Sequence, residues 1–221
     1  SPAFWLIVFA VLTFIVVIKG VEKGIEKVSK VLMPILVAMA IFISVYGLMT
    51  PGAIEGLKYY IIPDFSNFSI MTVIAAVGQM FYSLSIGMGI LFSYMKKEVD
   101  MEKAISQVEI MDTLIAFLAG LMIIPAVFAF SGKESLNAGA SLMFITMPKV
   151  FDSLQLGGFI GLVFFLLVLF AALTSAISLM ECSVATLMEQ LHISRKKASF
   201  VMIGEMLLLG IPISLGYGVL G

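Results

Sequence analysis

The chain has 221 residues, of which 61% are hydrophobic and only 12% are charged, and its formal net charge is −1. A soluble domain is about half apolar and about a quarter charged, so the composition excludes an ordinary soluble protein and indicates an all-α integral membrane protein. A single cysteine, Cys182, excludes a disulfide framework within the chain, and a single histidine, His192, excludes a histidine-based metal site. No basic cluster with interleaved aromatic residues indicates a nucleic-acid partner, and no nucleophile–base pair indicates an enzyme.

Six apolar segments approach or exceed the length of about 20 residues that spans a bilayer. They lie at about 3–18, 31–49, 69–94, 105–131, 158–180 and 198–216. The first begins almost directly after Ser1, with no initiator methionine, and the last ends shortly before Gly221. We therefore expect the chain to be truncated at both ends and to be part of a longer protein.

Basic residues are distributed unequally between the connections of these segments. The loops after the first, third and fifth segments carry Lys19, Lys23, Lys27, Lys30, Lys96, Lys97, Lys103, Arg195, Lys196 and Lys197. The remaining basic residues, Lys58, Lys133 and Lys149, belong to the alternate loops. Because cytoplasmic loops are enriched in Lys and Arg, the richer side is predicted to face the cytoplasm.

The two long outer loops differ in character. Residues 50–68 contain Pro51, Gly52, Pro63 and Asp64 and are predicted to form a turn-rich connection. Residues 132–157 contain an apolar stretch, 140–150, that is too short to span a bilayer. This stretch is interpreted either as an amphipathic hairpin over the outer face or as an ordinary interfacial loop.

The third segment has an unusual polar centre, Gly78-Gln79-Met80-Phe81-Tyr82-Ser83-Leu84-Ser85-Ile86-Gly87-Met88-Gly89. Serine competes with the helix for backbone hydrogen bonds, and glycine weakens a helix interior. In hydrocarbon, the freed backbone groups are tolerated only where protein or a polar cavity satisfies them. We therefore predict a helix broken near the bilayer midplane, where carbonyl and hydroxyl oxygens bind a small polar ligand.

Asp112 is the acidic residue that lies deepest in an apolar segment, the fourth. An ionisable side chain inside a membrane segment is costly and marks a functional site by default. Glu109 and Glu181 can reach the cytoplasmic interface, and Glu205 could pair with a helix outside this chain. Asp112 is therefore the strongest functional candidate among the acids.

Ala171, Thr174 and Ser175 share one face of the fifth segment, because they are spaced i, i+3, i+4. The face offers two hydroxyls and, if the helix loosens locally, one carbonyl, which are oxygen ligands of the kind that hard cations take. Spacing alone favours the other interpretation, a small-residue packing face whose hydroxyls bond back to the helix.

The two polar motifs resemble signatures of the neurotransmitter:sodium symporter family. The stretch 78–89 is similar to the sixth-helix signature, and Leu173-Thr174-Ser175 is similar to the eighth-helix sodium motif. Pro63-Asp64-Phe65 and Ser194-Arg195-Lys196 also resemble bacterial members. The resemblance covers essentially the whole chain and implies helices four to nine of a twelve-helix, inverted-repeat (5+5), leucine-transporter-like fold. It also implies that the third span is discontinuous and that 132–157 holds an external gate hairpin.

The resemblance implies roles for individual residues. Ser83 and Asp112 match ligands of a first sodium ion, although the family usually has Asn at the position of Asp112. Ala171 (through its carbonyl), Thr174 and Ser175 match ligands of a second sodium ion. The substrate-pocket positions are Phe81, Tyr82, Ser83, Ser85, Met88 and Leu179. Gln79 and Ser83 resemble chloride-site residues of animal members, and the negative charge of Asp112 is expected to make chloride unnecessary.

These roles together imply sodium-coupled symport of an apolar or aromatic amino acid by alternating access, in a bacterial or archaeal inner (plasma) membrane. The helices that complete both sodium sites are expected N-terminal to this chain, so the chain alone should not transport. Two alternatives stay open: a proton-coupled carrier of the same architecture, with Asp112 as proton relay, and a non-transporting scaffold subunit whose polar faces serve assembly.

Overall fold

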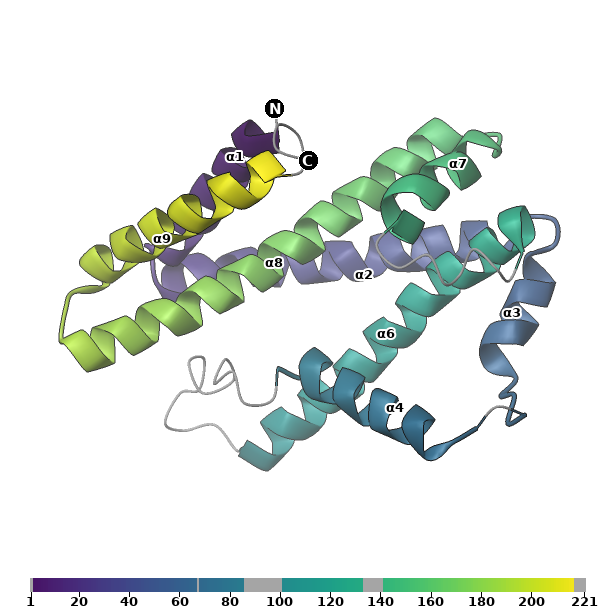
Figure 1. The fold of residues 1–221 in the computed structure, drawn as a ribbon, viewed down its shortest axis with the longest axis horizontal. Helices are drawn as coiled ribbons and strands as arrows, with labels where there is room; N and C mark the ends of the chain where they lie inside the picture. Colours follow the sequence, from purple (N-terminus) through teal and green to yellow (C-terminus); the bar gives the residue numbers. More distant parts are fainter. Residues whose placement is uncertain (1, 67, 86–100, 133–140, 217–221) are drawn as a thin grey trace. The chain divides into compact units, whose positions relative to one another are not determined.

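The computed structural model of the protein describes residues 2–66, 68–85, 101–132 and 141–216 (Figure 1). All regular elements in these ranges are helical. They are α1 (Pro2–Val17), η1 (Val21–Ile25), α2 (Glu26–Leu48), α3 (Ala53–Ile61), α4 (Ile70–Ser83), α6 (Met101–Ser131), η3 (Leu142–Thr146), α7 (Met147–Asp152), α8 (Gly157–Leu191) and α9 (Arg195–Gly216). The elements η1 and η3 are short π-helical turns.

Four helical stretches within the described residues are long and apolar enough to cross a membrane, namely Val21–Leu48, Glu102–Ser131, Gly157–Leu191 and Arg195–Gly216. The first and third predicted segments contain the shorter apolar helices α1 and α4, with 16 and 14 residues. The second half of the third segment, from Ile86 onward, lies outside the described residues. Each predicted segment therefore contains a helix, and four of them reach spanning length.

Two helices extend further than their hydropathy predicts. Helix α8 continues to Leu191, whereas the apolar segment ends at about residue 180, and α2 begins at Glu26 rather than near residue 31. Hydropathy marks only the part of a helix that lies in hydrocarbon. The polar turns beyond that part keep their helical hydrogen bonds, but hydropathy alone does not predict them.

The chain forms two compact units. The first unit contains residues 2–33 and 170–216 of the described chain, and the second contains 34–85, 101–132 and 141–169. Helices α2 and α8 each contribute to both units, because the boundaries lie after Met33 and before Phe170. Each unit has its own hydrophobic core.

The core of the second unit is formed by α2, α6, α7 and the first half of α8. Ile43, Val127 and Phe164 are buried in it, and the rings of Phe151 and Phe164 lie 5.2 Å apart. Met147 and Val150 of α7 are also fully buried, so this end of the apolar stretch 140–150 packs into the core, whereas Phe144 and Ile145 of η3 are exposed. The predicted external gate hairpin stays a prediction, because residues 133–140 lie outside the described residues.

Helix α3 lies in the outer loop that was predicted to be a turn-rich connection. Pro51 and Gly52 precede the helix, and Gly52 has φ = 87°, a left-handed conformation that glycine adopts without strain. The turn residues therefore start a helix instead of preventing one. Helix α3 was not predicted, because residues 50–68 were interpreted as one turn-rich connection.

Helix α3 packs against α6 through close contacts (Figure 1). A Cβ at Gly56 would lie 2.7 Å from the Phe128 Cβ. The Tyr60 ring stacks on Phe117 with centroids 5.5 Å apart, and its hydroxyl donates a hydrogen bond to the Phe117 carbonyl at 3.3 Å. The same ring covers Gly120, where an added Cβ would overlap it. Glycine at positions 56 and 120 is thus required by this packing.

The core of the first unit is formed by α1, η1, the second half of α8 and α9. Val17, Ile177 and Val184 are buried in it. Helix α1 packs along α9, and the rings of Phe14 and Phe200 lie 5.0 Å apart. This unit therefore joins segments from the two ends of the sequence.

Candidate functional site

Helix α4 ends in the middle of the apolar segment that contains it. It begins with a capping box between Ser69 and Thr72 and ends at Ser83. Its 14 residues correspond to about 21 Å, which is less than the ~30 Å of hydrocarbon in a bilayer. Leu84 leaves the helix with ψ = 0°, and Ser85 has φ = 53°, an uncommon conformation for a residue other than glycine. The helix therefore stops at the two serines of the polar centre.

Ser83 and Asp112 come together although they are 29 residues apart. The Ser83 hydroxyl donates to the Asp112 carboxylate, with Oγ 2.7 Å from Oδ1 and 2.9 Å from Oδ2. Both residues belong to the second unit. Ser83 ends α4, and Asp112 lies in the N-terminal half of α6. Hydrogen bonds to a charged acceptor are shorter and stronger than neutral ones. The arrangement concentrates oxygen atoms and one negative charge at the end of α4.

The other predicted residues on α4 are mostly exposed. Phe81 is 52% exposed and Tyr82 71%, and Gln79 is also exposed, one turn before Ser83. No residue of α4 is buried. Ser85 is half-buried, and the predicted pocket residue Met88 lies outside the described residues. Within the described chain, the apolar and aromatic faces of α4 are thus left open to further elements.

The hydroxyl face of α8 belongs to the first unit. The Thr174 Oγ1 donates to the Ala171 carbonyl at 2.9 Å, and the Ser178 Oγ donates to the Thr174 carbonyl at 3.1 Å. Ser175 is exposed, as is Leu179 at 51%. Helix α8 is continuous through these positions, so the local loosening considered above is not present. The back-bonded hydroxyl of Thr174 matches the packing interpretation and also holds two candidate ligand oxygens close together.

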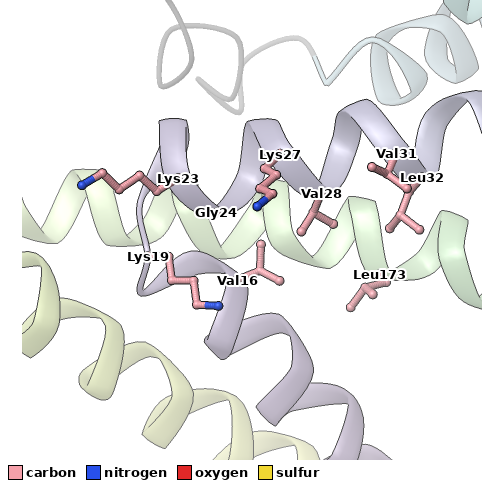
Figure 2. A pocket seen from close by; sticks show the side chains of 9 residues that line it. All are labelled: Val16, Lys19, Lys23, Gly24, Lys27, Val28, Val31, Leu32 and Leu173. Carbon is pink, nitrogen blue, oxygen red and sulfur yellow. The ribbon is translucent and has the colours of Figure 1, made fainter.

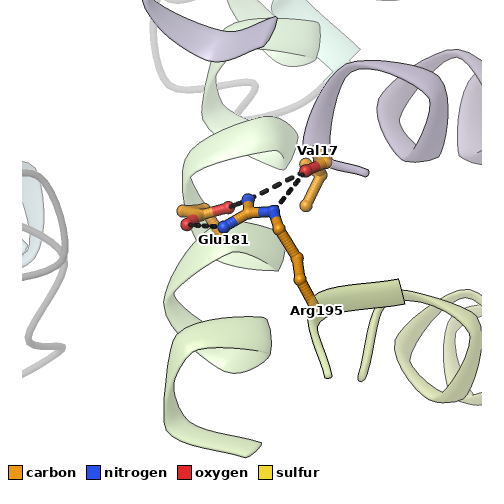
Figure 3. Close-up of polar contacts among 3 residues, drawn as sticks. All are labelled: Val17, Glu181 and Arg195. Atoms are coloured by element: carbon orange, nitrogen blue, oxygen red, sulfur yellow. Dashed lines mark hydrogen bonds and ion pairs between the residues drawn. The ribbon is translucent and has the colours of Figure 1, made fainter. Parts of the chain in front are cut away.

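A second charged pair, which the sequence analysis missed, lies in the first unit (Figure 3). The Glu181 side chain is 2% exposed and forms a two-pronged ion pair with the Arg195 guanidinium, in which one nitrogen–oxygen distance is 3.0 Å. The same guanidinium donates to the Val17 carbonyl through Nε at 3.0 Å and a terminal nitrogen at 2.8 Å. Val17 ends α1, so Arg195 satisfies one of the carbonyls that a helix end leaves without an intrahelical partner.

The position of Glu181 at the cytoplasmic interface stays a prediction, but its burial and its pairing with Arg195 were not predicted. One pattern in the sequence could have indicated this pair: Glu181 stands at the end of an apolar segment, and the basic residue Arg195 follows after a short connection, at the start of the next helix. That connection folds back at His192, which has φ = 54°. Arg195 thereby returns to the level of Glu181.

The comparisons with known proteins agree with the motifs. The sequence model of the sodium:neurotransmitter symporter family matches residues 2–219 of the chain. The chain belongs to this family. It is 39% identical over 217 residues to the sodium-dependent transporter YhdH of Bacillus subtilis, covering 97% of this chain and 48% of that protein. It is also 39% identical over 217 residues to a sodium-dependent transporter of Haemophilus influenzae, covering 96% and 47% of the two chains.

Among solved structures, the chain is similar to MhsT in complex with L-phenylalanine, with 42% identity and a TM-score of 0.85. The match covers 100% of this chain and 50% of that one. The all-helical fold is therefore the fold of this transporter family. The chain spans about half the length of the curated relatives that it matches.

Proposed function

We propose that this chain forms about half of a sodium-coupled amino-acid symporter. The observation that carries the proposal is the contact between Ser83 and Asp112, which joins the two predicted ligands of a first sodium ion. Membership of the family and the similarity to MhsT, solved with L-phenylalanine, support the same function.

The first sodium site consists of the Ser83 hydroxyl and the Asp112 carboxylate, completed by residues outside this chain. Donation to Asp112 leaves the lone pairs of the Ser83 oxygen free and increases their negative charge. A cation beside the pair gains from both oxygens and from the full charge of the carboxylate. Among the described residues no Lys or Arg forms an ion pair with Asp112, so this charge is available to a cation.

The charge of Asp112 also makes chloride unnecessary. Gln79 and Ser83 occupy positions that resemble the chloride site of animal members, and Ala116, one turn after Asp112, carries no acid. A carboxylate that contacts Ser83 supplies the negative charge which a bound chloride would otherwise provide. Sodium binding is therefore independent of chloride.

The second sodium site uses the Ala171 carbonyl and the hydroxyls of Thr174 and Ser175 on α8. The Thr174 Oγ1 and the Ala171 carbonyl oxygen lie 2.9 Å apart, close enough to bind one ion once the hydroxyl hydrogen turns away. Neutral oxygens suffice for a monovalent cation, whereas a divalent ion would draw carboxylates.

The substrate binds where α4 ends. The third span is discontinuous there, and carbonyls released around Tyr82 and Ser83 accept the substrate ammonium group. Phe81, Tyr82 and Ser85 contribute to the pocket, and the family resemblance adds Met88 and Leu179. A methionine at position 88 suits a bulky apolar or aromatic substrate, because methionine side chains adapt their shape. Because sodium and substrate share oxygens around Ser83, each raises the affinity of the other. The ions favour an outward-open form, and occupancy of the site permits rocking to an inward-open form.

The test uses the full-length protein in liposomes with an inward sodium gradient and labelled phenylalanine as substrate. Ser83→Ala should weaken the apparent sodium affinity about tenfold, the loss of one hydrogen-bonded oxygen near a charge. Ser178→Ala, which removes a hydroxyl bonded to its own helix, is the matched control. Unchanged sodium affinity in Ser83→Ala would overturn the first site, and uptake driven by a pH gradient without sodium would favour the proton-coupled alternative.

A further inference from the structure

A pocket of about 550 Å³ lies in the first unit, and its lining contains none of the residues assigned to ions and substrate, although Leu173 is the chain neighbour of Thr174 (Figure 2). Its polar wall consists of Lys19, Lys23 and Lys27, and its apolar wall includes Val28, Leu32 and Leu173. The lysines belong to the connection between α1 and α2 and to the first turn of α2. The excess of basic residues predicts that this connection faces the cytoplasm.

The three ammonium groups carry charge that the described chain does not neutralise. None of the lysines forms an ion pair with a carboxylate, whereas their neighbour Lys30 bonds Glu26 at 2.7 Å. In Figure 2 the ammonium ends of Lys19 and Lys27 point into the space between the end of α1 and the start of α2, and Lys23 extends away from it. Among the residues that the structure describes, no acidic side chain lines the pocket. The pocket therefore attracts an anion.

The pocket is polar at one end and apolar at the other. Along α2, Leu32 follows Lys27 by five residues, which places it about 7.5 Å deeper along the helix axis. Val28 and Leu173 extend the same apolar wall. A free inorganic anion would use the lysines and leave this wall without a function. A molecule with an anionic head and a hydrocarbon tail contacts both.

We propose that this pocket binds an anionic phospholipid of the inner leaflet. The lipid phosphate lies against Lys19 and Lys27, with Lys23 at the rim, and the first methylenes of an acyl chain lie against Val28, Leu32 and Leu173. Basic pockets between membrane helices on the cytoplasmic side are suited to anionic head groups, since each lysine adds electrostatic attraction. The site is separate from sodium and substrate binding and does not depend on the proposed transport function.

The test is native mass spectrometry of the full-length protein in detergent, titrated with dioleoyl phosphatidylglycerol or dioleoyl phosphatidylcholine. The wild type should bind one phosphatidylglycerol at least about tenfold more tightly than phosphatidylcholine. The triple variant Lys19→Gln, Lys23→Gln, Lys27→Gln should lose this preference. The control triple variant Lys30→Gln, Lys196→Gln, Lys197→Gln removes the same charge outside the pocket and should retain it.

Two further arms separate a lipid site from a site for free phosphate. Soluble glycerol phosphate at matched concentration should not displace phosphatidylglycerol. Leu32→Trp, which fills the apolar end, should weaken phosphatidylglycerol binding while leaving all three lysines in place. Equal losses in the two triple variants, or displacement by glycerol phosphate, would overturn the proposal. Thermal unfolding of each variant verifies that it is folded.

Discussion

Each unit contains an acid within an apolar helix, and the two acids have opposite surroundings. Glu181 in the first unit is buried and neutralised by the two-pronged contact with Arg195. Asp112 in the second unit is half-buried, and among the described side chains only the Ser83 hydroxyl donates to it. A carboxylate whose charge is balanced by a fixed arginine holds helices together, whereas one that lacks a fixed cation can bind a mobile one. The partner, rather than the acid, decides the role.

The largest effect on stability is expected when the ion pair between Glu181 and Arg195 is broken. Arg195→Ala should lower the free energy of unfolding of the full-length protein by about 3 kcal/mol, because it leaves the buried Glu181 charge unpaired. It also removes the donors to the Val17 carbonyl. Thermal unfolding in detergent measures the loss, and Lys196→Ala, the exposed neighbour, is the control.

The double variant Arg195→Ala with Glu181→Gln extends this experiment. If the unpaired charge causes the loss, neutralising it should restore a large part of the stability. A double variant no more stable than Arg195→Ala alone would mean that capping of α1, rather than charge balance, makes Arg195 important.

A smaller effect is expected from the packing of the helix that carries Asp112. Gly120→Ala places a Cβ against the Tyr60 ring, which is stacked on Phe117 and cannot easily shift. Overpacking of this kind costs about 1–3 kcal/mol. Gly204→Ala, in α9 with open space around its Cβ, is the matched control and should be neutral or slightly stabilising. Equal unfolding temperatures for the two variants would contradict the close contact of α3 with α6.

The contact between Ser83 and Asp112 leads to a prediction about the charge of the sodium site. Asp112→Asn should reduce the apparent sodium affinity about tenfold, which corresponds to about 1.4 kcal/mol, without the loss of stability seen for Arg195→Ala. It should also make uptake depend on chloride, since the fixed negative charge is gone. Glu109→Gln, an exposed acid one turn away, serves as the charge-matched control. The wild type should be indifferent to replacement of chloride by gluconate, and chloride dependence in the wild type would contradict the role of Asp112.

The smallest effect on stability is expected from the hydroxyl of the half-buried Tyr60 at high pH. Burial raises the pKa of Tyr60 above its ordinary value of 10.0. Above pH 10.0 the unfolded chain therefore releases this proton before the folded chain does, and stability falls as the pH rises toward the folded pKa. Tyr60→Phe should lose less stability than the wild type over this range. Parallel curves from chemical denaturation would show that the Tyr60 hydroxyl ionises equally in both states.

The family resemblance, rather than a pattern in the residues, assigned Ser83 and Asp112 to one ion site, and their side chains are in contact. The sequence predicted the helical membrane class and the segments that contain the helices. These follow from hydropathy and from polar residues that a lipid-facing helix does not need. It did not predict α3, because Pro and Gly occur both in turns and at the start of helices. Pro51 and Gly52 alone therefore do not distinguish the two. It also missed the Glu181–Arg195 pair, because this contact depends on the continuation of α8 to Leu191 and on the reversal at His192.

The hydrogen bond between Arg195 and Val17 joins residues 178 positions apart in the sequence. The described residues of the second unit are encoded between them, in the stretches 34–85, 101–132 and 141–169. At a synthesis rate of about 5–20 residues per second, the end of α1 waits roughly 10–35 s for its arginine. All described residues of the second unit are therefore synthesised before Arg195, and the contact that joins α1 to α9 in the first unit forms only after them.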